Sequence, residues 1–248
     1  MTQNPLLKAV FKPHKAFKVI LDIKKIGFSP FRLSAYLFEL YNDSHFWDYV
    51  NRTIQEAKST FPDSRLGGWM LGYPAIMLYP IVRLTKPQIV VETGVGPGGS
   101  SALILHALNR NGKGYLHSID LPGNDALVYP QIGRCYNIHV PPGYEVGWLV
   151  PPWLRGRWNL QLGDSKQVLP PLLKEVGSID MFLHDSLHTD EHITFELTAS
   201  FPYLNEGGLL LADDVNEYWS MAFVTFCRSN GVQFIVLGNR LGIARKGI

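Results

Sequence analysis

Acidic side chains follow two apolar segments in the second half of the chain. Asp185 ends the run 179–185, and the pair Asp213 and Asp214 ends the run 208–214. If these runs are neighbouring parallel strands, their carboxyl ends point into one crevice, where open α/β sheets bind ligands. Carboxylates that converge there repel one another unless protons or a cation intervene, and oxygen-only ligands suit Mg²⁺. Asp185, Asp213 and Asp214 are therefore candidate magnesium ligands. The alternative for the Asp213-Asp214 pair is a loop start that caps a helix.

His188 is the candidate base of the same crevice. It lies three residues past Asp185, and a neutral imidazole there can take a proton from a hydroxyl group. The alternative is a histidine that is hydrogen-bonded at a helix start or that holds a carboxylate. Strand alternation places His184 on the opposite face from Asp185, so we expect a packed role for it. His192, four residues after His188, is expected to be solvated.

A glycine-rich segment, residues 91–101, follows an apolar run and opens a helical stretch. Glycines at such a turn let the backbone approach a ligand closely, and the start of a helix offers free N–H groups. Asp120 ends the next apolar run, 24 residues after Gly96, where an acid can accept hydrogen bonds from a ribose diol. This order of strand, glycine loop, helix, strand and acid is a stronger signal than the glycines alone.

Two classes of ligand fit the glycine loop. Gly94, Gly96 and Gly99 satisfy the G-x-G-x-x-G spacing of dinucleotide-binding enzymes. Glu92 argues against that class, because a carboxylate there repels a pyrophosphate and suits the cationic amino-acid end of S-adenosylmethionine (SAM). A second acidic turn at Asp164 follows the third apolar run, and its side chain can accept a hydrogen bond from an adenine amino group.

The elements that must position these residues alternate from residue 88 onward. Short apolar runs and helical stretches follow one another, as is typical of βαβ units around a parallel sheet. The predicted strands are 88–93, 115–120, 158–163, 179–185, 208–214, 232–238 and 240–246. The predicted linking helices are 101–109, 166–176, 191–205 and 217–229. Only Asn239 separates the last two strands, which predicts a tight antiparallel pair.

Residues 1–84 are predicted to be an N-terminal helical extension of a domain that covers 85–248. Within the extension, residues 30–60 and 66–84 have the apolar spacing of helices. The first 25 residues carry six lysines and one acid, which indicates either a basic amphipathic segment for an anionic membrane or partner, or a solvated helix packed on the body. Pro13 interrupts the pattern and favours the packed helix.

The interval between Asp120 and Trp158 is too long for a linking helix, because it holds 37 residues. Prolines and tryptophans are frequent in it. Long irregular insertions in compact domains tend to be lids or binding loops, so we expect residues 121–158 to be a lid-like insertion over the site. The alternative is a surface excursion without a role.

Composition and charge exclude several classes of protein. Hydrophobic residues make up 46% of the chain and charged residues 18%, which excludes a disordered or collagen-like chain. The net charge of +2, without a basic patch in the second half, gives no reason to expect a nucleic-acid partner. The two cysteines are too few for a disulfide scaffold, and no apolar run reaches the ~20 residues of a membrane span, so we expect a cytoplasmic protein.

In these motifs the sequence resembles the class I SAM-dependent methyltransferases over about residues 70–248. The family's E-x-G-x-G-x-G loop is present from Glu92 to Gly98, its second-strand acid as Asp120, and its G-D-[SA] turn as 163–165. The resemblance implies an α/β, Rossmann-like, seven-stranded and mostly parallel sheet with an antiparallel last strand. The cofactor-binding residues that it implies are Glu92, Thr93, Gly94, Gly96, Gly98, Ser100, Ser101, Asp120, Asp164, Ser165 and Asp185.

The segments after the fourth and fifth predicted strands are similar to a subgroup of that family, the metal-dependent sugar and small-molecule O-methyltransferases. The resemblance implies that Asp185, Asp213 and Asp214 hold Mg²⁺. Asp190 and Val215 replace tyrosines that are usual in the subgroup, and we expect both positions to line the acceptor pocket. The resemblance also makes a homodimer the expected assembly.

We therefore predict a SAM-dependent O-methyltransferase. Its acceptor is expected to be a small polar or natural-product molecule, sugar-like or phenolic, whose hydroxyl group is activated by His188 and Asp185 with the help of Mg²⁺. Two alternatives stay open: an NAD(P)-dependent oxidoreductase, and a non-catalytic SAM- or nucleotide-binding module. The basic N-terminus leaves contact with a membrane or a lipid-linked acceptor as a weaker hypothesis.

Overall fold

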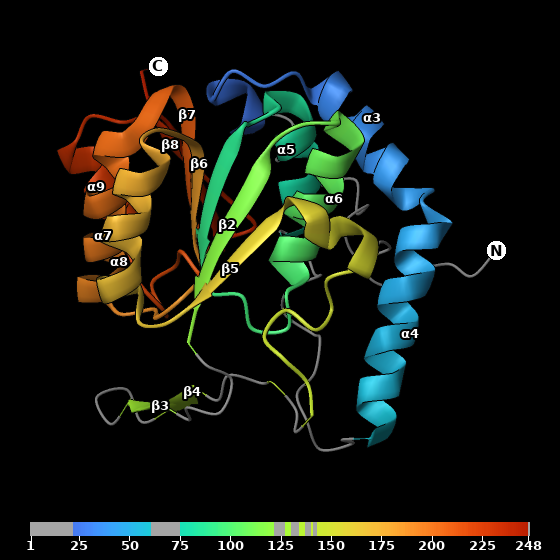
Figure 1. Cartoon of the computed structure of the whole chain (residues 1–248). Coiled ribbons are helices and arrows are strands. Elements are labelled where there is room, and N and C mark those ends of the chain that lie inside the picture. The colour runs from blue at the N-terminus through green and yellow to red at the C-terminus, as the bar shows by residue number, and fades with distance from the viewer. Residues whose placement is uncertain are drawn as a thin grey trace.

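The structure is a computed structural model that describes residues 22–60, 75–121, 140 and 143–247, and the backbone of 127–129 and 134–136. Seven strands form one sheet in the order β5-β2-β1-β6-β7-β9-β8 (Figure 1). All neighbouring strands pair in parallel except β9, which runs antiparallel to both β7 and β8. The predicted α/β sheet with its reversed last strand is confirmed.

The strands of the sheet lie close to the ranges predicted for them. They are β1 (Ile89–Thr93), β2 (Tyr115–Asp120), β5 (Trp158–Leu162), β6 (Ile179–His184), β7 (Leu204–Ala212), β8 (Phe234–Leu237) and β9 (Leu241–Arg245). A separate antiparallel pair, β3 (Leu127–Tyr129) and β4 (Arg134–Tyr136), belongs to the predicted insertion. In Figure 1 this pair lies beyond the edge of the sheet at which β2 ends.

The helices differ from the predicted ranges at several ends. They are α3 (Pro30–Tyr41), α4 (Ser44–Thr60), α5 (Leu78–Thr85), α6 (Gly99–Asn111), α7 (Ser165–Val176), α8 (Asp190–Ser200) and α9 (Ala222–Ser229). Short 3₁₀ turns are η1 (Ala75–Met77), η3 (Pro152–Arg157) and η4 (Phe201–Tyr203). Residues 66–74 of the predicted helix 66–84 lie outside the described residues.

Three of these differences have a local physical reason. The stretch 30–60 is two helices because the side chain of Asp43 accepts a hydrogen bond from the Phe46 N–H and so begins a second helix. The helix predicted to reach residue 205 ends at Ser200, since a 3₁₀ turn that contains Pro202 follows it. The helix predicted from residue 217 begins at Ala222, because Asn216 accepts hydrogen bonds from the next backbone N–H groups and forms a turn.

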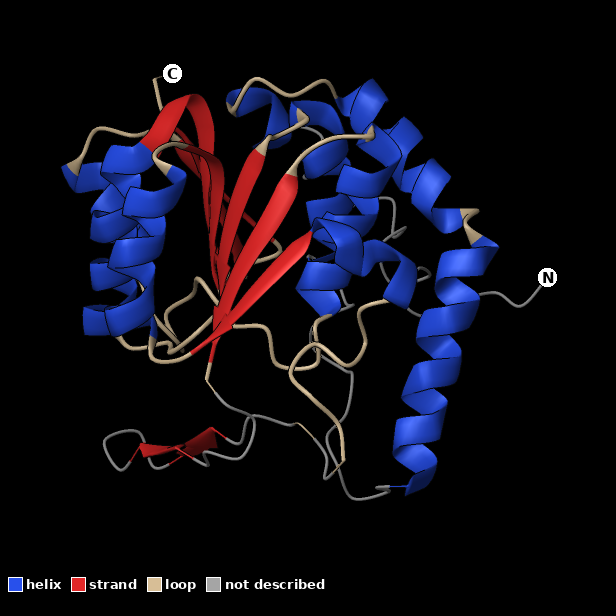
Figure 2. Ribbon diagram, viewed as in Figure 1, coloured by secondary structure: helices blue, strands red, loops and turns tan. Residues whose placement is uncertain are grey.

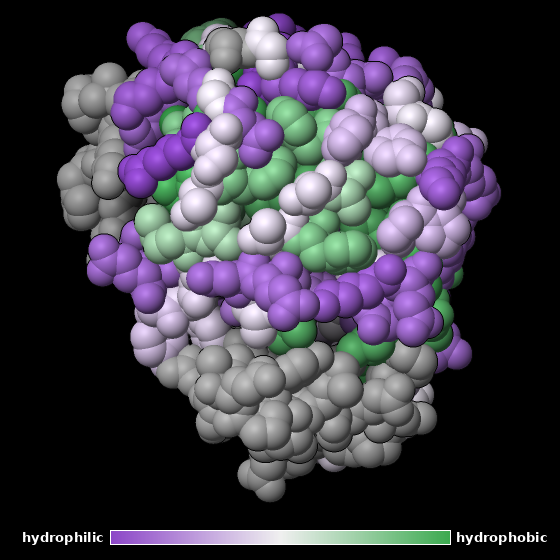
Figure 3. Space-filling model, turned by 90° about the vertical axis from the view of Figure 1, so that its left-hand side faces the viewer, coloured by the Kyte–Doolittle hydropathy of each residue, from purple (hydrophilic) through white to green (hydrophobic). Residues whose placement is uncertain are grey.

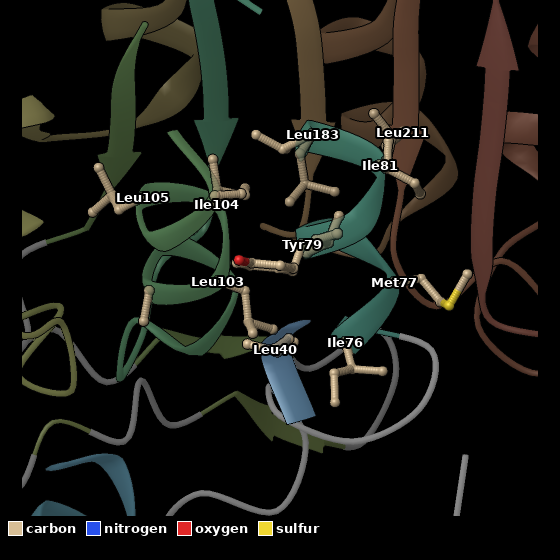
Figure 4. Packing of buried hydrophobic residues seen from close by; sticks show 14 of the residues in the cluster. Leu40, Ile76, Met77, Tyr79, Ile81, Leu103, Ile104, Leu105, Leu183 and Leu211 are labelled. Atoms are coloured by element: carbon tan, nitrogen blue, oxygen red, sulfur yellow. The ribbon is translucent and has the colours of Figure 1, made fainter. Parts of the chain in front are cut away.

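Helices cover both faces of the sheet (Figure 2). One face packs against α7, α8 and α9, and the other against α5, α6 and the N-terminal helices. The central strand β1 is buried on both sides: Val90 faces one hydrophobic cluster and Val91 the other. Figure 4 shows how Tyr79, Ile104, Leu183 and Leu211 from α5, α6, β6 and β7 fill the space of the first cluster.

The helices α3 and α4 share this cluster with the sheet domain. The apolar stripe of α4 is buried, and the Phe46 ring stacks on His106 of α6 with centroids 4.4 Å apart. Ion pairs fix the contact from the outside: Arg83 of α5 donates to Glu39 of α3, and Arg110 of α6 donates to Asp43. Residues 22–60 are therefore held by the same core as the sheet.

The outer surface of the α7–α9 layer carries apolar side chains in its middle, bordered by hydrophilic ones (Figure 3). Within the described ranges, no helix has both the length and the apolar character needed to cross a membrane.

We expect Phe46→Ala to destabilise the protein by about 3–5 kcal/mol, because it leaves a cavity at a fully buried ring. The matched control is Phe38→Ala on α3, whose ring is 67% exposed and whose loss should change stability by no more than ~0.5 kcal/mol. Urea unfolding of both variants and the wild type measures the difference. Equal, small effects would show that α4 is not part of the core on which the sheet depends.

Candidate active site

The candidate site lies where β1, β2, β6 and β7 end. Backbone hydrogen bonds of 2.8–2.9 Å tie these ends together: Gly94 N–H to Ile119 O, Asp185 N–H to Thr93 O, and Asp213 N–H to His184 O. The glycine loop, Asp120, Asp185 and the Asp213-Asp214 pair are thereby brought to one edge of the sheet. The expectation that these residues converge there is confirmed.

Three glycines of the loop have positive φ, each in a different environment. At Gly94, with φ +84°, a Cβ atom would lie 2.0 Å from the carbonyl oxygen of Asp185. At Gly98, a Cβ atom would meet Gly147 and Val150 at 2.9 Å. Gly96 has φ +52° and open space on the side where a Cβ atom would lie. Packing therefore requires Gly94 and Gly98, whereas Gly96 leaves the backbone open to a ligand.

Glu92 lies under the loop and is fully buried. Its carboxylate accepts hydrogen bonds from the hydroxyls of Ser100 at 2.5 Å, Ser101 at 2.6 Å and Ser118 at 2.9 Å. Burial raises the pKa of Glu92, and the three hydroxyl donors oppose that effect. Direct contact of Glu92, Ser100 and Ser101 with a cofactor stays a prediction; the observed contacts tie the start of α6 to β1 and β2.

Asp120 receives the N–H groups of the glycine loop. Its Oδ2 accepts from Val95 N at 3.0 Å and Gly96 N at 2.7 Å, and its Oδ1 accepts from Leu121 N at 2.7 Å. Burial raises the pKa of Asp120, and these backbone donors lower it again in part. A carboxylate accepts about four hydrogen bonds, so beside these three described donors Asp120 can take one from a ribose hydroxyl.

The described end of the predicted insertion is fixed to the glycine loop. Gly147 N donates to Gly96 O at 2.8 Å, and Leu149 N donates to Pro97 O at 2.9 Å. Trp148, the residue between Gly147 and Leu149, is buried. This part of the insertion is a packed wall of the site. The lid role of 121–158 stays a prediction, and most of residues 122–142 lie outside the described residues.

The acidic turn after β5 lies beside Asp120, because Gly163 N donates to Asp120 O at 2.7 Å. Asp164 is exposed and caps α7 by accepting from Lys166 N at 2.9 Å. Its predicted contact with adenine agrees with this place but stays a prediction. Ser165 is buried, and its hydroxyl lies 2.9 Å from Nε2 of His192 on α8, which gives its side chain a partner inside the protein.

A buried carboxylate that the sequence analysis missed, Glu196 of α8, gathers four polar side chains. They are Thr93 Oγ1 at 2.6 Å, His184 Nδ1 at 2.6 Å, Ser186 Oγ at 2.8 Å and His192 Nε2 at 2.9 Å. Burial alone would raise the pKa of Glu196, but the hydrogen bonds and charges of the two histidines hold it well below its usual range. The i, i+4 spacing of His192 and Glu196 was a signal for this network.

This network corrects one expectation and confirms another. His192 is buried instead of solvated, because Glu196 and Ser165 both bind its ring. The hydroxyl of Thr93 donates to Glu196 on the α8 side of the sheet, and direct contact of Thr93 with a cofactor stays a prediction. His184 lies on the face opposite to Asp185 and is packed, as strand alternation predicts.

Asp213 and Asp214 share a cation that the sequence analysis also missed, Arg240, which lies in the turn just before β9. Its Nε lies 2.9 Å from Asp213 Oδ1 and 3.1 Å from Asp214 Oδ1, and its Nη2 lies 2.6 Å from Asp213 Oδ2. The antiparallel register was the available signal, because Ala212 pairs with Gly242. Continued by two residues, that register places Asp214 opposite Arg240.

Asp185 and His188 complete the cluster. Nε2 of His188 lies 3.7 Å from Asp185 Oδ1 and 3.8 Å from Asp214 Oδ2. Burial, followed by the charges of Asp213 and Asp214, raises the pKa of Asp185 well above its usual range. Burial raises the pKa of Asp214 to about 6 and lowers that of His188 to about 3. His188 is therefore neutral at physiological pH, and the Trp219 ring lies 5.9 Å from its own ring.

The expected magnesium site does not fit this arrangement. Asp185, Asp213 and Asp214 do lie together, and their oxygen atoms are the ligands that Mg²⁺ prefers. The guanidinium of Arg240 nevertheless binds both oxygens of Asp213 and one of Asp214, which leaves a divalent cation to compete with a fixed positive charge. In the described part of the chain, no group of three or more His, Cys, Asp or Glu side chains could hold a metal ion.

Comparison with known families identifies one domain. The model of a family described as "Methyltransferase domain" matches residues 91–215, the stretch from β1 through the Asp213-Asp214 pair. The comparison with curated proteins found no match.

Solved structures with the same fold include three methyltransferases. SAH-bound PaMTH1 from Podospora anserina is 14% identical, with a TM-score of 0.54 over 80% of this chain and 88% of that one. The O-methyltransferase TomG from Streptomyces achromogenes, bound to SAM, is 16% identical, with a TM-score of 0.53 over 80% and 89%. CalS11, a TDP-rhamnose 3'-O-methyltransferase of calicheamicin biosynthesis, is 18% identical, with a TM-score of 0.50 over 80% and 94%.

We expect Gly94→Ala to destabilise the protein more than Gly96→Ala. Gly94→Ala should cost well over ~1–2 kcal/mol of stability, because the left-handed backbone strain adds to a collision with the Asp185 carbonyl. Gly96→Ala should lose only the stability that the left-handed backbone strain costs, ~1–2 kcal/mol, because its added Cβ atom would meet open space. Chemical unfolding of the two variants checks this order, which equal losses would contradict.

We expect the His188 imidazole to stay neutral down to about pH 5. Its pKa is about 3 in the folded protein, against ~6.5 for a free histidine. Between these values the unfolded chain takes up a proton that the folded protein does not, so the residue's contribution to stability is present above pH 6.5 and is lost as pH falls towards 3. NMR titration of the ring C–H signal, assigned with His188→Gln, measures the pKa. A midpoint near 6.5 would contradict the buried, neutral state.

Proposed function

Since this chain belongs to the methyltransferase-domain family and has the class I SAM-dependent fold, we propose that its site transfers the methyl group of SAM to a hydroxyl oxygen of a small acceptor. The observation that carries the O-methylation proposal is the cluster of Asp185, His188 and Asp214 at the ends of β6 and β7. It places a neutral imidazole 3.7 Å from a carboxylate whose pKa is raised, beside the glycine loop. A hydroxyl acceptor needs such a pair because it must lose a proton.

The glycine loop and Asp120 suit a SAM molecule. The open side of Gly96 lets a ligand approach the backbone, and Asp120 is held in place by the loop's own N–H groups. When bound, SAM supplies a methyl group already activated on a sulfonium, so the reaction depends chiefly on the position of the acceptor oxygen. We assign the ribose to Asp120 and the adenine to the Asp164 turn.

The proton of the acceptor goes to His188 and Asp185 acting together. With a pKa of about 3, His188 alone is a weak base. The raised pKa of Asp185 makes that carboxylate a stronger base than an ordinary aspartate. When Nε2 of His188 takes the hydroxyl proton, the negative charge of Asp185 stabilises the imidazolium that forms. Asp214 Oδ2 lies at a similar distance from the same nitrogen, 3.8 Å.

We propose a sugar-like or phenolic acceptor. Trp219 lies beside His188 and Tyr218 is largely exposed next to it, and aromatic rings pack against both kinds of molecule. Among proteins of this fold, CalS11 is a TDP-rhamnose 3'-O-methyltransferase and TomG takes part in tomaymycin synthesis. The homodimer, the cytoplasmic location and the weak lipid-linked hypothesis stay predictions.

The family match argues against an NAD(P)-dependent oxidoreductase. Such an enzyme would also have to place a pyrophosphate above the buried carboxylate of Glu92. A non-catalytic SAM-binding module is the remaining alternative. It would leave the paired His188 and Asp185 without a chemical role.

We expect S-adenosylhomocysteine to bind with micromolar affinity in isothermal titration, and Asp120→Asn to weaken binding by roughly tenfold or more. The loss follows from removing a charge that ribose hydroxyls bind, a contact of about 1.5–3 kcal/mol. The matched control is Asp48→Asn on the exposed side of α4, which should bind like the wild type. Binding of NADH in place of S-adenosylhomocysteine would overturn the proposal.

Turnover separates the enzyme from the binding module. Mass spectrometry of mixtures with glycosylated and phenolic acceptors should show a product 14 Da heavier, the mass of a CH₂ group. Asp185→Asn should lose product while still binding S-adenosylhomocysteine. Product at wild-type levels from Asp185→Asn would remove this residue from the proposed mechanism.

A further inference from the structure

The Asp213-Asp214 pair already has a cation of its own. The guanidinium of Arg240 holds Asp213 with two nitrogens, at 2.9 Å and 2.6 Å, and approaches Asp214 at 3.1 Å. Bidentate bonds of this kind between a guanidinium and a carboxylate are among the stronger charge-assisted contacts in proteins. A guanidinium keeps its charge at all physiological pH values, so this balance is permanent.

The backbone holds the three residues in place. Arg240 O accepts a hydrogen bond of 2.7 Å from Val215 N, and Asp213 N donates to His184 O at 2.9 Å. Asp214 has a left-handed φ of 53°, a conformation that an aspartate adopts only at some cost. Arg240 itself follows the tight turn at Gly238 and Asn239, both with positive φ. The contact is therefore set by the β8–β9 hairpin and the end of β7, and not by a mobile surface side chain.

This geometry meets the requirements of a metal poorly. Mg²⁺ requires near-ideal octahedral oxygen ligands at ~2.0–2.1 Å. Both oxygens of Asp213 and one of Asp214 already bind the guanidinium. A divalent cation in the same place would have to displace those bonds and lie beside a positive charge in a largely buried site, where repulsion is weakly screened.

We propose that Arg240 replaces the divalent metal of the acidic site: its guanidinium balances Asp213 and Asp214, and the protein binds no metal there. Asp185, which Arg240 does not contact in any described hydrogen bond or ion pair, then faces the acceptor hydroxyl together with His188. The assignment of Arg240 as the resident cation is independent of the reaction. Only the role of Asp185 and His188 towards an acceptor rests on the proposed function.

Mn²⁺ titration followed by electron paramagnetic resonance tests the proposal without any substrate. The free ion gives a six-line signal that is lost on binding. We expect the six-line signal in the presence of the wild-type chain to be as strong as in a protein-free sample. Arg240→Gln should bind Mn²⁺ at least about tenfold more tightly than the wild type, because the guanidinium no longer competes for the carboxylates.

Two further variants identify the site. Arg240→Gln with Asp213→Asn should lose the Mn²⁺ binding that Arg240→Gln gains, since one ligand is gone. Arg240→Lys keeps a positive charge and should bind as little Mn²⁺ as the wild type. Circular dichroism melting shows whether each variant is folded. If the Arg240→Gln variant does not fold, the comparison of the wild type with Arg240→Lys and Asp213→Asn still decides whether the native site takes the ion.

Binding of Mn²⁺ by the wild type that Asp213→Asn abolishes would overturn the proposal. A folded Arg240→Gln variant that does not bind Mn²⁺ would also overturn the proposal, because Arg240 would then not be the group that replaces the metal. In the wild type, binding of S-adenosylhomocysteine should be equal within twofold in EDTA and in Mg²⁺. If S-adenosylhomocysteine does not bind at all, the proposed function fails while the Mn²⁺ result stands by itself.

Discussion

Two buried carboxylates hold the end of β1 from opposite faces of the sheet, and the rest of the site depends on this arrangement. On one face, Glu92 collects serine hydroxyls from α6 and β2. On the other, Glu196 of α8 collects Thr93 of β1 and His184 of β6. A buried carboxylate that loses its donors is costly, so each acid fixes the elements that reach it. These hydrogen bonds hold the glycine loop and the end of β6 in place beside the candidate site.

The protein compensates its buried acids in three chemically different ways. Glu92 is surrounded by neutral hydroxyls and has a raised pKa, whereas Glu196 is bound by imidazoles and has a lowered one. Asp213 is bound by the guanidinium of Arg240. Asp185 has no described hydrogen bond to a hydroxyl, imidazole or guanidinium; the His188 imidazole lies 3.7 Å away, and burial, followed by the charges of Asp213 and Asp214, raises the pKa of Asp185. Because the other acids are satisfied by structure, Asp185 is the carboxylate best suited to exchange a proton.

The sheet and the glycine loop could be predicted because their signals are local. Apolar runs, the spacing of Gly94, Gly96 and Gly98, and an acid at the end of the next strand lie within short windows of sequence. Arg240 could not be found in that way, since it meets Asp213 only through the register of β9 on β7. Glu196 lies inside a helix between Phe195 and Leu197, and a charged side chain at such a place is usually on the solvated face of the helix. The ligand sets depended on pairings between distant segments, and the sequence analysis therefore did not see the guanidinium that competes for the predicted magnesium ligands.

The place of β9 in the sheet has a consequence for how the protein reaches its native state. This strand comes last among the described elements but lies between β7 and β8. Until the hairpin inserts, Asp213 and Asp214 stand at the end of β7 without their guanidinium, and mutual repulsion opposes closure of that edge. Assembly of the charged site therefore requires the pairing of β9 with β7, so a chain in which this pairing has not formed does not carry a finished site.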